Sequence, residues 1–164
     1  HDNIKIYDST GKDMSWVEAI VKAYKPDILV LDMGDKFATR NTDKSDVYLK
    51  EAAIHARNIS KQYDCAIIWM SQLSAVAEGK VYVDQSMLEG SKTGKAAEAD
   101  LMILISKNPE LNEGKIHTAT IDPNDVSTNN QTQRHLNIAK NKLRGGWHGV
   151  VHCELDGARA RYKA

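Results

Sequence analysis

The sequence predicts an α/β fold in which a mostly parallel sheet is covered by helices and carries an antiparallel meander at its edge. Three continuous apolar runs support this, residues 27–32 (DILVLD), 65–70 (CAIIWM) and 101–106 (LMILIS). Such runs are typical of parallel strands that are buried on both faces. Helical patterns separate the runs, as in a doubly covered sheet. After residue 106 the pattern changes to short strands joined by glycine turns.

The first hundred residues predict the elements in the following order. Residues 4–7 (IKIY) predict a short first strand. Val17, Val21 and Tyr24 recur at helical spacing, and Pro26 ends that helix. Residues 46–63 predict a longer amphipathic helix, and the alanine-rich stretch before residue 100 predicts a short one at residues 96–99.

The carboxyl-terminal part predicts the meander. Its strands are expected at residues 135–142, 149–155 and 159–163, joined by the turns LRGGWH and DGA. Residues 107–134 form a long polar connection rich in Asn and Thr. A connection of that length in a compact domain is either mobile or functional.

Length and composition are those of one globular domain. The chain has 164 residues, of which 41% are hydrophobic and 27% charged, so we expect a single domain over residues 1–164. No apolar run approaches the roughly 20 residues that a membrane helix needs, and no signal peptide is visible. We expect Cys65 and Cys153 to be free thiols in a reducing cytoplasm.

Charge is unevenly spread although the net charge is zero. Residues 1–89 have 11 Lys and Arg against 14 Asp and Glu, and residues 90–164 have 11 against 8. A basic carboxyl-terminal part can meet phosphates, but a solvated basic face has the same composition.

Residues 88–100 (LEGSKTGKAAEAD) have the composition of a phosphate-binding loop but not its spacing. A P-loop has four residues between its glycines and a Ser or Thr after its lysine. Here three residues separate Gly90 from Gly94, and Ala96 follows Lys95. The segment is therefore not a P-loop.

Two side chains are expected at the carboxyl edge of the parallel strands, where α/β sheets bind ligands. Asp32 ends the apolar run 27–32, as the acidic residue of a Walker B strand does, and such a carboxylate holds Mg²⁺ through water. Gln72 follows the next run, where an amide can hydrogen-bond a γ-phosphate. Taken singly, either residue also fits an ordinary strand end.

Two further clusters contain side chains that could bind phosphate or metal. Lys140, Lys142 and Arg144 surround a glycine turn, where a cation can reach a phosphate across a subunit interface; a plain basic hairpin is the alternative. A zinc site at His148, His152 and Cys153 is disfavoured, because His152 and Cys153 are adjacent on a strand and point to opposite faces.

The order of these motifs resembles the carboxyl-terminal, RecA-like helicase domain of the DnaB family, most closely that of phage replicative helicases and primase-helicases. The motifs are a strand ending in Asp32, a strand followed by Ser-Gln, the SKTGKAAEAD loop, and an AKNK strand with its glycine turn. The resemblance runs from about residue 7 to residue 162. It implies a RecA-like three-layer fold and a hexameric, ATP- and Mg²⁺-dependent 5′→3′ DNA helicase of the cytoplasm of a bacterial or phage-infected cell.

The resemblance also implies roles for single residues. Asp32 would be the Walker B carboxylate that holds Mg²⁺, and Gln72 the γ-phosphate sensor. Residues 88–95 would form a DNA-binding loop in the ring's channel. The loop residues that would contact single-stranded DNA are Ser91, Lys92, Thr93 and Lys95.

The sequence departs from the family in two places. Either Lys142 or Arg144 would be the trans-acting finger, with Lys140 beside them, because Lys142 stands where the family has an arginine. The family's P-loop and catalytic glutamate lie upstream of residue 4, so we expect the chain alone to be an inactive fragment of the motor. The resemblance also implies a primase or a polymerase as a further partner. A recombinase-type ATPase and a nucleic-acid-binding module without enzymatic activity remain alternatives.

Overall fold

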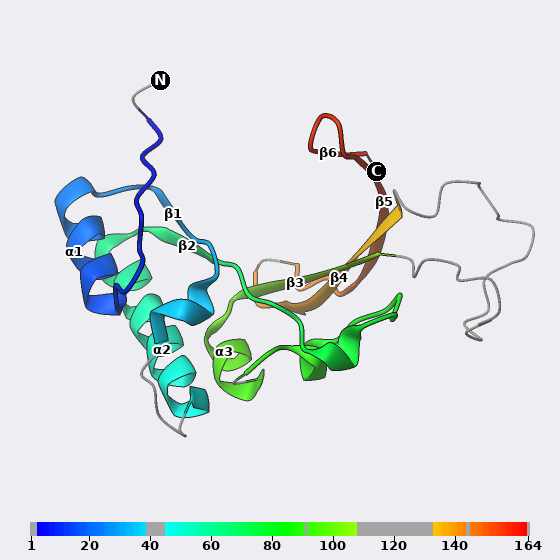
Figure 1. Cartoon of the computed structure of the whole chain (residues 1–164), viewed down its shortest axis with the longest axis horizontal. Helices are drawn as coiled ribbons and strands as arrows, with labels where there is room; N and C mark the ends of the chain where they lie inside the picture. Colours follow the sequence, from blue (N-terminus) through cyan, green and yellow to red (C-terminus); the bar gives the residue numbers. More distant parts are fainter. Residues whose placement is uncertain (1–2, 39–44, 91, 108–132, 144, 164) are drawn as a thin grey trace, which may run out of the picture. The chain divides into compact units, whose positions relative to one another are not determined.

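A computed structural model describes residues 3–38, 45–90, 92–107, 133–143 and 145–163 (Figure 1). The helices are α1 (Met14–Tyr24), α2 (Ser45–Tyr63) and α3 (Lys92–Glu98), with 3-10 helices η1 (Gly34–Ala38), η2 (Ala75–Ala77) and η3 (Gln85–Met87). The strands are β1 (Ile28–Leu31), β2 (Ala66–Trp69), β3 (Leu101–Lys107), β4 (Gln133–Asn141), β5 (Gly149–Asp156) and β6 (Arg161–Lys163).

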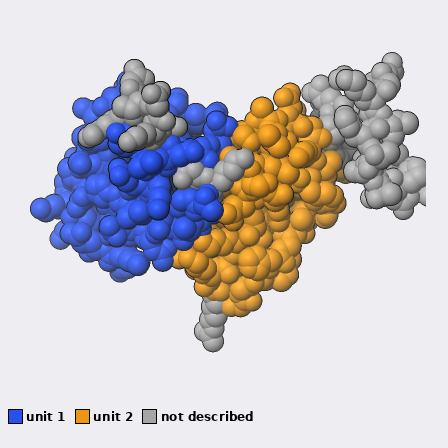
Figure 2. All heavy atoms as spheres, turned by 90° about the horizontal axis from the view of Figure 1, so that it is seen from below, with its two compact units in different colours: residues 1–72, 89–98 blue, residues 73–88, 99–164 orange. Residues whose placement is uncertain are grey.

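The chain forms two compact units, which Figure 2 colours separately. Unit 1 consists of residues 1–72 and 89–98, and unit 2 of residues 73–88 and 99–164. Each unit has a hydrophobic cluster of its own.

Unit 1 is built on the parallel pair β1–β2, with Ile28 opposite Ala66 and Leu31 opposite Trp69. Helices α1 and α2 pack on one face of this pair and bury Val21, Ile59 and Leu31 among other residues. The carboxylate of Asp13 caps α1 by accepting the backbone N–H of Trp16. The helix ends at Tyr24, and the next residue, Lys25, caps it with a left-handed backbone (φ 47°) directly before Pro26.

The prediction that β1 and β2 are buried on both faces is wrong for the described residues. Leu31 is 3% exposed, whereas Ile28, Val30 and Ile68 are 50–59% exposed. The reason is that α1 and α2 cover the same face, and side chains alternate between the faces along each strand.

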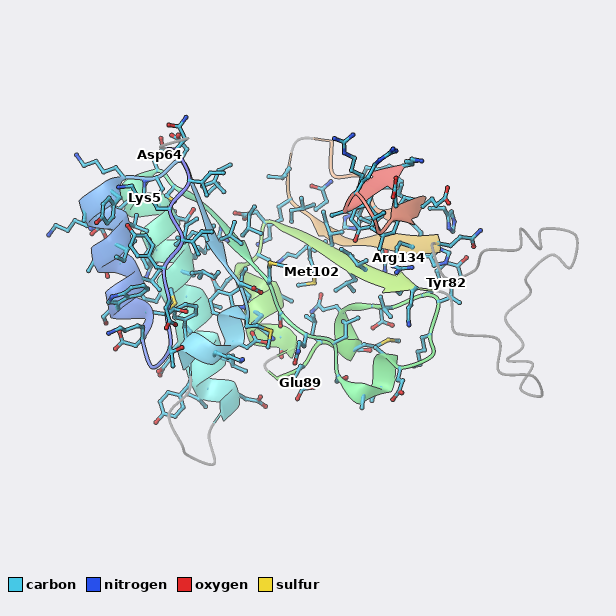
Figure 3. All side chains as sticks on the ribbon, turned by 45° about the horizontal axis from the view of Figure 1, so that its top comes forward. Lys5, Asp64, Tyr82, Glu89, Met102 and Arg134 are labelled. Atoms are coloured by element: carbon cyan, nitrogen blue, oxygen red, sulfur yellow. The ribbon has the colours of Figure 1, made fainter. Side chains whose placement is uncertain are left out.

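The predicted strand at residues 4–7 is also wrong, because these residues pair with no strand of the described chain. Aromatic contacts hold the segment instead: the ring of Tyr7 lies 6.2 Å from that of Trp16 and 5.8 Å from that of Tyr24, measured between centroids. The ammonium of Lys5 stands 4.1 Å from the centroid of the Tyr24 ring (Figure 3).

Unit 2 contains an antiparallel four-stranded sheet in the order β3–β4–β5–β6. The predicted carboxyl-terminal meander of β4, β5 and β6 is confirmed. The prediction that β3 continues the parallel sheet is wrong, since β3 pairs antiparallel with β4, with Ile105 opposite Leu136. Met102 and Leu104 of β3 belong to the core of this unit, with Val83, Met87 and Leu88 of the connecting segment.

The helix predicted at residues 96–99 is present but begins earlier, at Lys92. No helix of the described residues has the length and apolar character that would cross a membrane.

Candidate functional site

The carboxyl ends of β1 and β2 bring two predicted site residues, Asp32 and Gln72, to one edge of unit 1. β1 and β2 run parallel, so the residues that follow the two strands leave the sheet at the same edge. The pairing continues past the strands: the N–H of Met70 donates to the carbonyl of Leu31 (3.0 Å), and that of Gly34 donates to the carbonyl of Met70 (2.9 Å). Asp32 and Gln72 are both exposed. They are therefore open to a ligand at this edge.

A second carboxylate of this edge, Asp35, does not stand out in the sequence. It lies in η1, and its oxygens accept the indole N–H of Trp69 (3.0 Å) and the hydroxyl of Ser71 (2.5 Å). Its position three residues after Asp32, in DMGDK, is the signal that would have marked it. Ser71 likewise stands beside Gln72 in the Ser-Gln motif.

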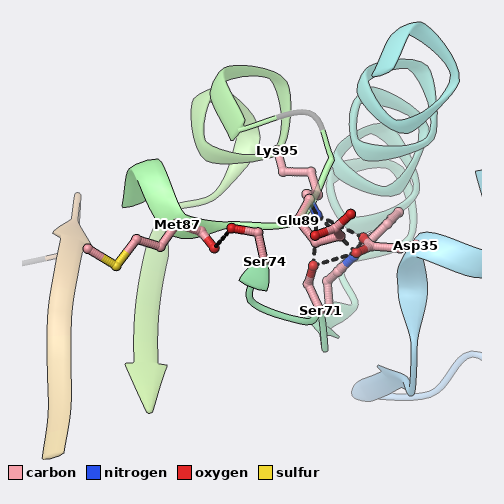
Figure 4. Close-up of polar contacts among 7 residues, drawn as sticks. Asp35, Ser71, Ser74, Met87, Glu89 and Lys95 are labelled. Atoms are coloured by element: carbon pink, nitrogen blue, oxygen red, sulfur yellow. Dashed lines mark hydrogen bonds and ion pairs between the residues drawn. The ribbon is translucent and has the colours of Figure 1, made fainter. Parts of the chain in front are cut away.

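Lys95 completes this cluster as the partner of Asp35 (Figure 4). Its Nζ lies 3.1 Å from Oδ1 and 3.0 Å from Oδ2 of Asp35, 2.7 Å from Oγ of Ser71 and 2.5 Å from the carbonyl oxygen of Glu89. The side chain is only 8% exposed. We call Asp35, Ser71, Lys95 and the Glu89 carbonyl the Lys95 anchor.

The other residues of the predicted DNA loop differ from Lys95. Thr93 is exposed in the first turn of α3, and Lys92 begins that helix. Ser91 lies outside the described residues. The predicted contact of these residues with DNA remains a prediction, and for Lys95 it conflicts with the ion pair that buries its ammonium.

A backbone hydrogen bond joins Gln72 to this same loop. The N–H of Glu89 donates to the carbonyl of Gln72 at 3.1 Å. Gln72 lies three residues after β2, and this bond closes the excursion of residues 73–88. An antiparallel bridge between Leu73 and Leu88 lies beside it. Gln72 and the start of the loop are therefore joined by a direct backbone contact.

The predicted finger residues belong to unit 2. Lys140 lies in β4 opposite Met102, and Lys142 follows that strand, with its N–H donating to the carbonyl of Asp100 (2.7 Å). Arg144 lies outside the described residues. The choice between Lys142 and Arg144 as the finger stays open.

Two histidines meet on the sheet of unit 2, a contact that the sequence did not predict. His135 and His152 are opposite each other on β4 and β5, and their Nδ1 atoms lie 2.7 Å apart. Burial lowers the pKa of His135, and the neighbouring His152 lowers it further. Within the described parts of the chain, no three His, Cys, Asp or Glu side chains gather as metal ligands do.

Comparison with known proteins identifies solved structures that have a similar fold. No protein-family model matches the chain, and no curated protein matches its sequence. A solved structure of a DnaB-like replicative helicase, described with its interactions with primase, has a TM-score of 0.73 and 16% identity, and the match covers 98% of this chain and 36% of the other. A second solved structure, described as an ATPase domain, has a TM-score of 0.74 and 16% identity, with 98% and 54% covered.

The chain therefore shares the fold of DnaB-like helicase ATPase domains, which confirms the resemblance seen in the sequence at the level of the fold. It spans 36% and 54% of the length of these two chains.

Proposed function

We propose that this chain is part of the motor domain of a ring-shaped, ATP-dependent 5′→3′ replicative DNA helicase that works as a homo-hexamer. The observation that carries the proposal is the edge of β1–β2: it holds Asp32 and Gln72 together, and a backbone hydrogen bond joins Gln72 to the loop at Glu89. A motor needs such a connection, because hydrolysis at one place must move DNA at another.

Asp32 suits the role of a Walker B carboxylate. It is exposed at the carboxyl end of a parallel strand, and no described residue bonds its oxygens. Carboxylate oxygen is a ligand that Mg²⁺ accepts, usually with several waters and phosphate oxygens completing the shell. Asp32 would hold the ion through water; the bound ion neutralises charge on the phosphates of ATP.

Gln72 would report the γ-phosphate to the loop, and the loop would bind single-stranded DNA. Ser91, Lys92 and Thr93 are the residues proposed to contact the phosphates of the DNA. Such contacts do not depend on the base sequence. Either Lys142 or Arg144, with Lys140 nearby, would be the trans-acting finger, whose positive charge contacts the phosphates of the nucleotide bound to a neighbouring subunit. One fold neighbour is described with primase, and we extend a primase partner to this chain as part of the proposal.

The experiment uses the complete parent protein. We expect DNA-stimulated ATP hydrolysis and unwinding of a fork with a 5′ tail but not of one with only a 3′ tail. Asp32→Asn should lower kcat by about 100-fold or more, since it weakens electrostatic stabilisation of the transferring phosphate. Asp27→Asn is the matched control: Asp27 is exposed at the opposite end of the same strand, and its substitution should leave kcat unchanged.

Other outcomes separate the alternatives. Strand exchange without unwinding would indicate a recombinase. DNA binding with no hydrolysis would indicate a binding module. Hydrolysis by the isolated chain that disappears in Asp32→Asn would contradict the expectation that this chain needs the rest of the motor domain.

A further inference from the structure

We propose that Lys95 is a positioning residue: through Asp35 it ties the start of the DNA loop and α3 to the edge that carries Asp32 and Gln72, and it does not contact DNA itself. The inference rests on the proposed function for its consequence, but its structural part concerns unit 1 alone. It changes the role that the sequence assigns to Lys95.

The ammonium of Lys95 has no donor left for a ligand. A lysine ammonium has three N–H donors. Four acceptor atoms already surround Nζ within 3.1 Å: both carboxylate oxygens of Asp35, Oγ of Ser71 and the Glu89 carbonyl. With the side chain 8% exposed, a phosphate would have to displace protein partners that are in place.

Asp35 makes leaving this position costly. Its carboxylate accepts hydrogen bonds from Trp69, Ser71 and Lys95, and with Lys95 it forms an ion pair. Removing one partner of a largely buried ion pair leaves the other charge uncompensated, which is strongly destabilising. If Lys95 moved to bind DNA, the Asp35 carboxylate would lose its ion-pair partner. The structure therefore favours a Lys95 that stays bound to Asp35 over one that alternates between Asp35 and DNA.

The anchor connects three segments that are distant in sequence. Asp35 lies in η1, three residues after Asp32, and Ser71 is adjacent to Gln72. The third segment is the loop, which the anchor holds at the Glu89 carbonyl and at Lys95 of α3. Glu89 is thus fixed twice, through its N–H to Gln72 and through its carbonyl to Lys95. Movement at the nucleotide edge would reach the loop through both links.

The first test measures amide hydrogen exchange in this chain without DNA or nucleotide. Lys95→Met and Asp35→Asn should each speed exchange at Glu89 and in α3 by about tenfold or more, because local opening no longer breaks the ion pair. The double variant should add little to either single change, since both remove one interaction. Lys61→Met, at an exposed lysine near the end of α2, should have no effect.

The exchange of β1 and β2 amides serves as the check that unit 1 is folded. Asp35→Asn is the milder variant, because the asparagine oxygen can still accept the N–H of Trp69 in the place of Oδ1. Its amide NH2, in the place of Oδ2, can donate to the hydroxyl oxygen of Ser71. It keeps the test decisive if Lys95→Met does not fold. Unchanged exchange at Glu89 in a folded Asp35→Asn variant would overturn the inference.

The second test measures single-stranded DNA affinity against salt in the complete parent. The anchor predicts that Asp35→Asn and Lys95→Met both weaken binding, by roughly tenfold, because the loop must then be ordered on binding. Neither should change the slope of log K against log salt, since every phosphate keeps its protein partners. A direct contact predicts otherwise: Lys95→Met would lower the slope by about 0.7, and Asp35→Asn, which frees the lysine, would preserve or strengthen binding.

The two tests separate this inference from the proposed function. A parent protein that binds no DNA would refute the function, while the exchange measurement would still decide whether the anchor exists. A reduced salt slope in Lys95→Met would refute the positioning role and leave the helicase proposal intact.

Discussion

Replacing Gly34 by alanine should destabilise unit 1, because the indole of Trp69 occupies the space of the new methyl group. A Cβ at Gly34 would lie 2.5 Å from Cε2, 2.6 Å from Nε1 and 2.7 Å from Cδ2 of Trp69. The backbone cannot easily retreat, since the N–H of Gly34 donates to the carbonyl of Met70 at 2.9 Å. The ring has to move, and its N–H then leaves Asp35, which it meets at 3.0 Å.

The expected cost follows from these contacts. Forcing a methyl group into a packed site costs about 1–3 kcal/mol, and losing a hydrogen bond to a charged acceptor costs about 1.5–3 kcal/mol. Alanine restricts the unfolded chain more than glycine does, which offsets about 0.4–1 kcal/mol. The net loss is about 2–5 kcal/mol, equivalent to an increase in the unfolding equilibrium constant of roughly 30-fold to 4000-fold.

Hydrogen exchange of the β2 amides measures this loss, because these amides exchange when unit 1 opens. Gly157→Ala is the matched control, since a Cβ there would meet nothing within 4 Å. In a Trp69→Ala background, the clash is absent and Gly34→Ala should cost less than about 1 kcal/mol. An equal cost in both backgrounds would refute the reasoning, since the indole would not be its source.

Three more predictions follow from the site and the second unit. In the complete parent, Gln72→Ala should retain nucleotide binding but reduce the stimulation of ATPase by DNA; an unchanged stimulation factor would exclude the sensor role. Lys92→Ala should weaken single-stranded DNA binding alike for all sequences and lower the salt slope by about 0.7 for each phosphate that the loop no longer neutralises; an unchanged slope would exclude the contact. Because burial lowers the pKa of His135, its folded state favours the neutral ring, so its stability contribution is complete above pH 6.5 and is lost as the pH falls below that value. The urea midpoint of unit 2 should therefore drop between pH 7.5 and 5, and His135→Phe should reduce the drop; an equal drop in the variant would exclude His135.

The sequence by itself determined most local elements and the edge that carries the candidate site. Helical spacing located α1 and α2, and apolar runs located β1 and β2, because periodicity depends on residues close in sequence. The parallel pairing then brings Asp32 and Gln72 to one edge, since parallel strands end on the same side. The glycine turns likewise located the carboxyl-terminal meander.

Only the tertiary structure decided which partners these elements have. The run at residues 101–106 suits a parallel or an antiparallel strand equally well, and its pairing with β4 depends on a segment more than 25 residues later. The segment at residues 4–7 has the composition of a strand but finds aromatic rings of α1 instead of a strand edge. The resemblance places Lys95 in a DNA-binding loop, yet its ammonium is paired with the carboxylate of Asp35, which lies 60 positions away in the sequence. Charge composition does not reveal such a pair, because Coulomb attraction depends on distance in space and not on distance along the chain.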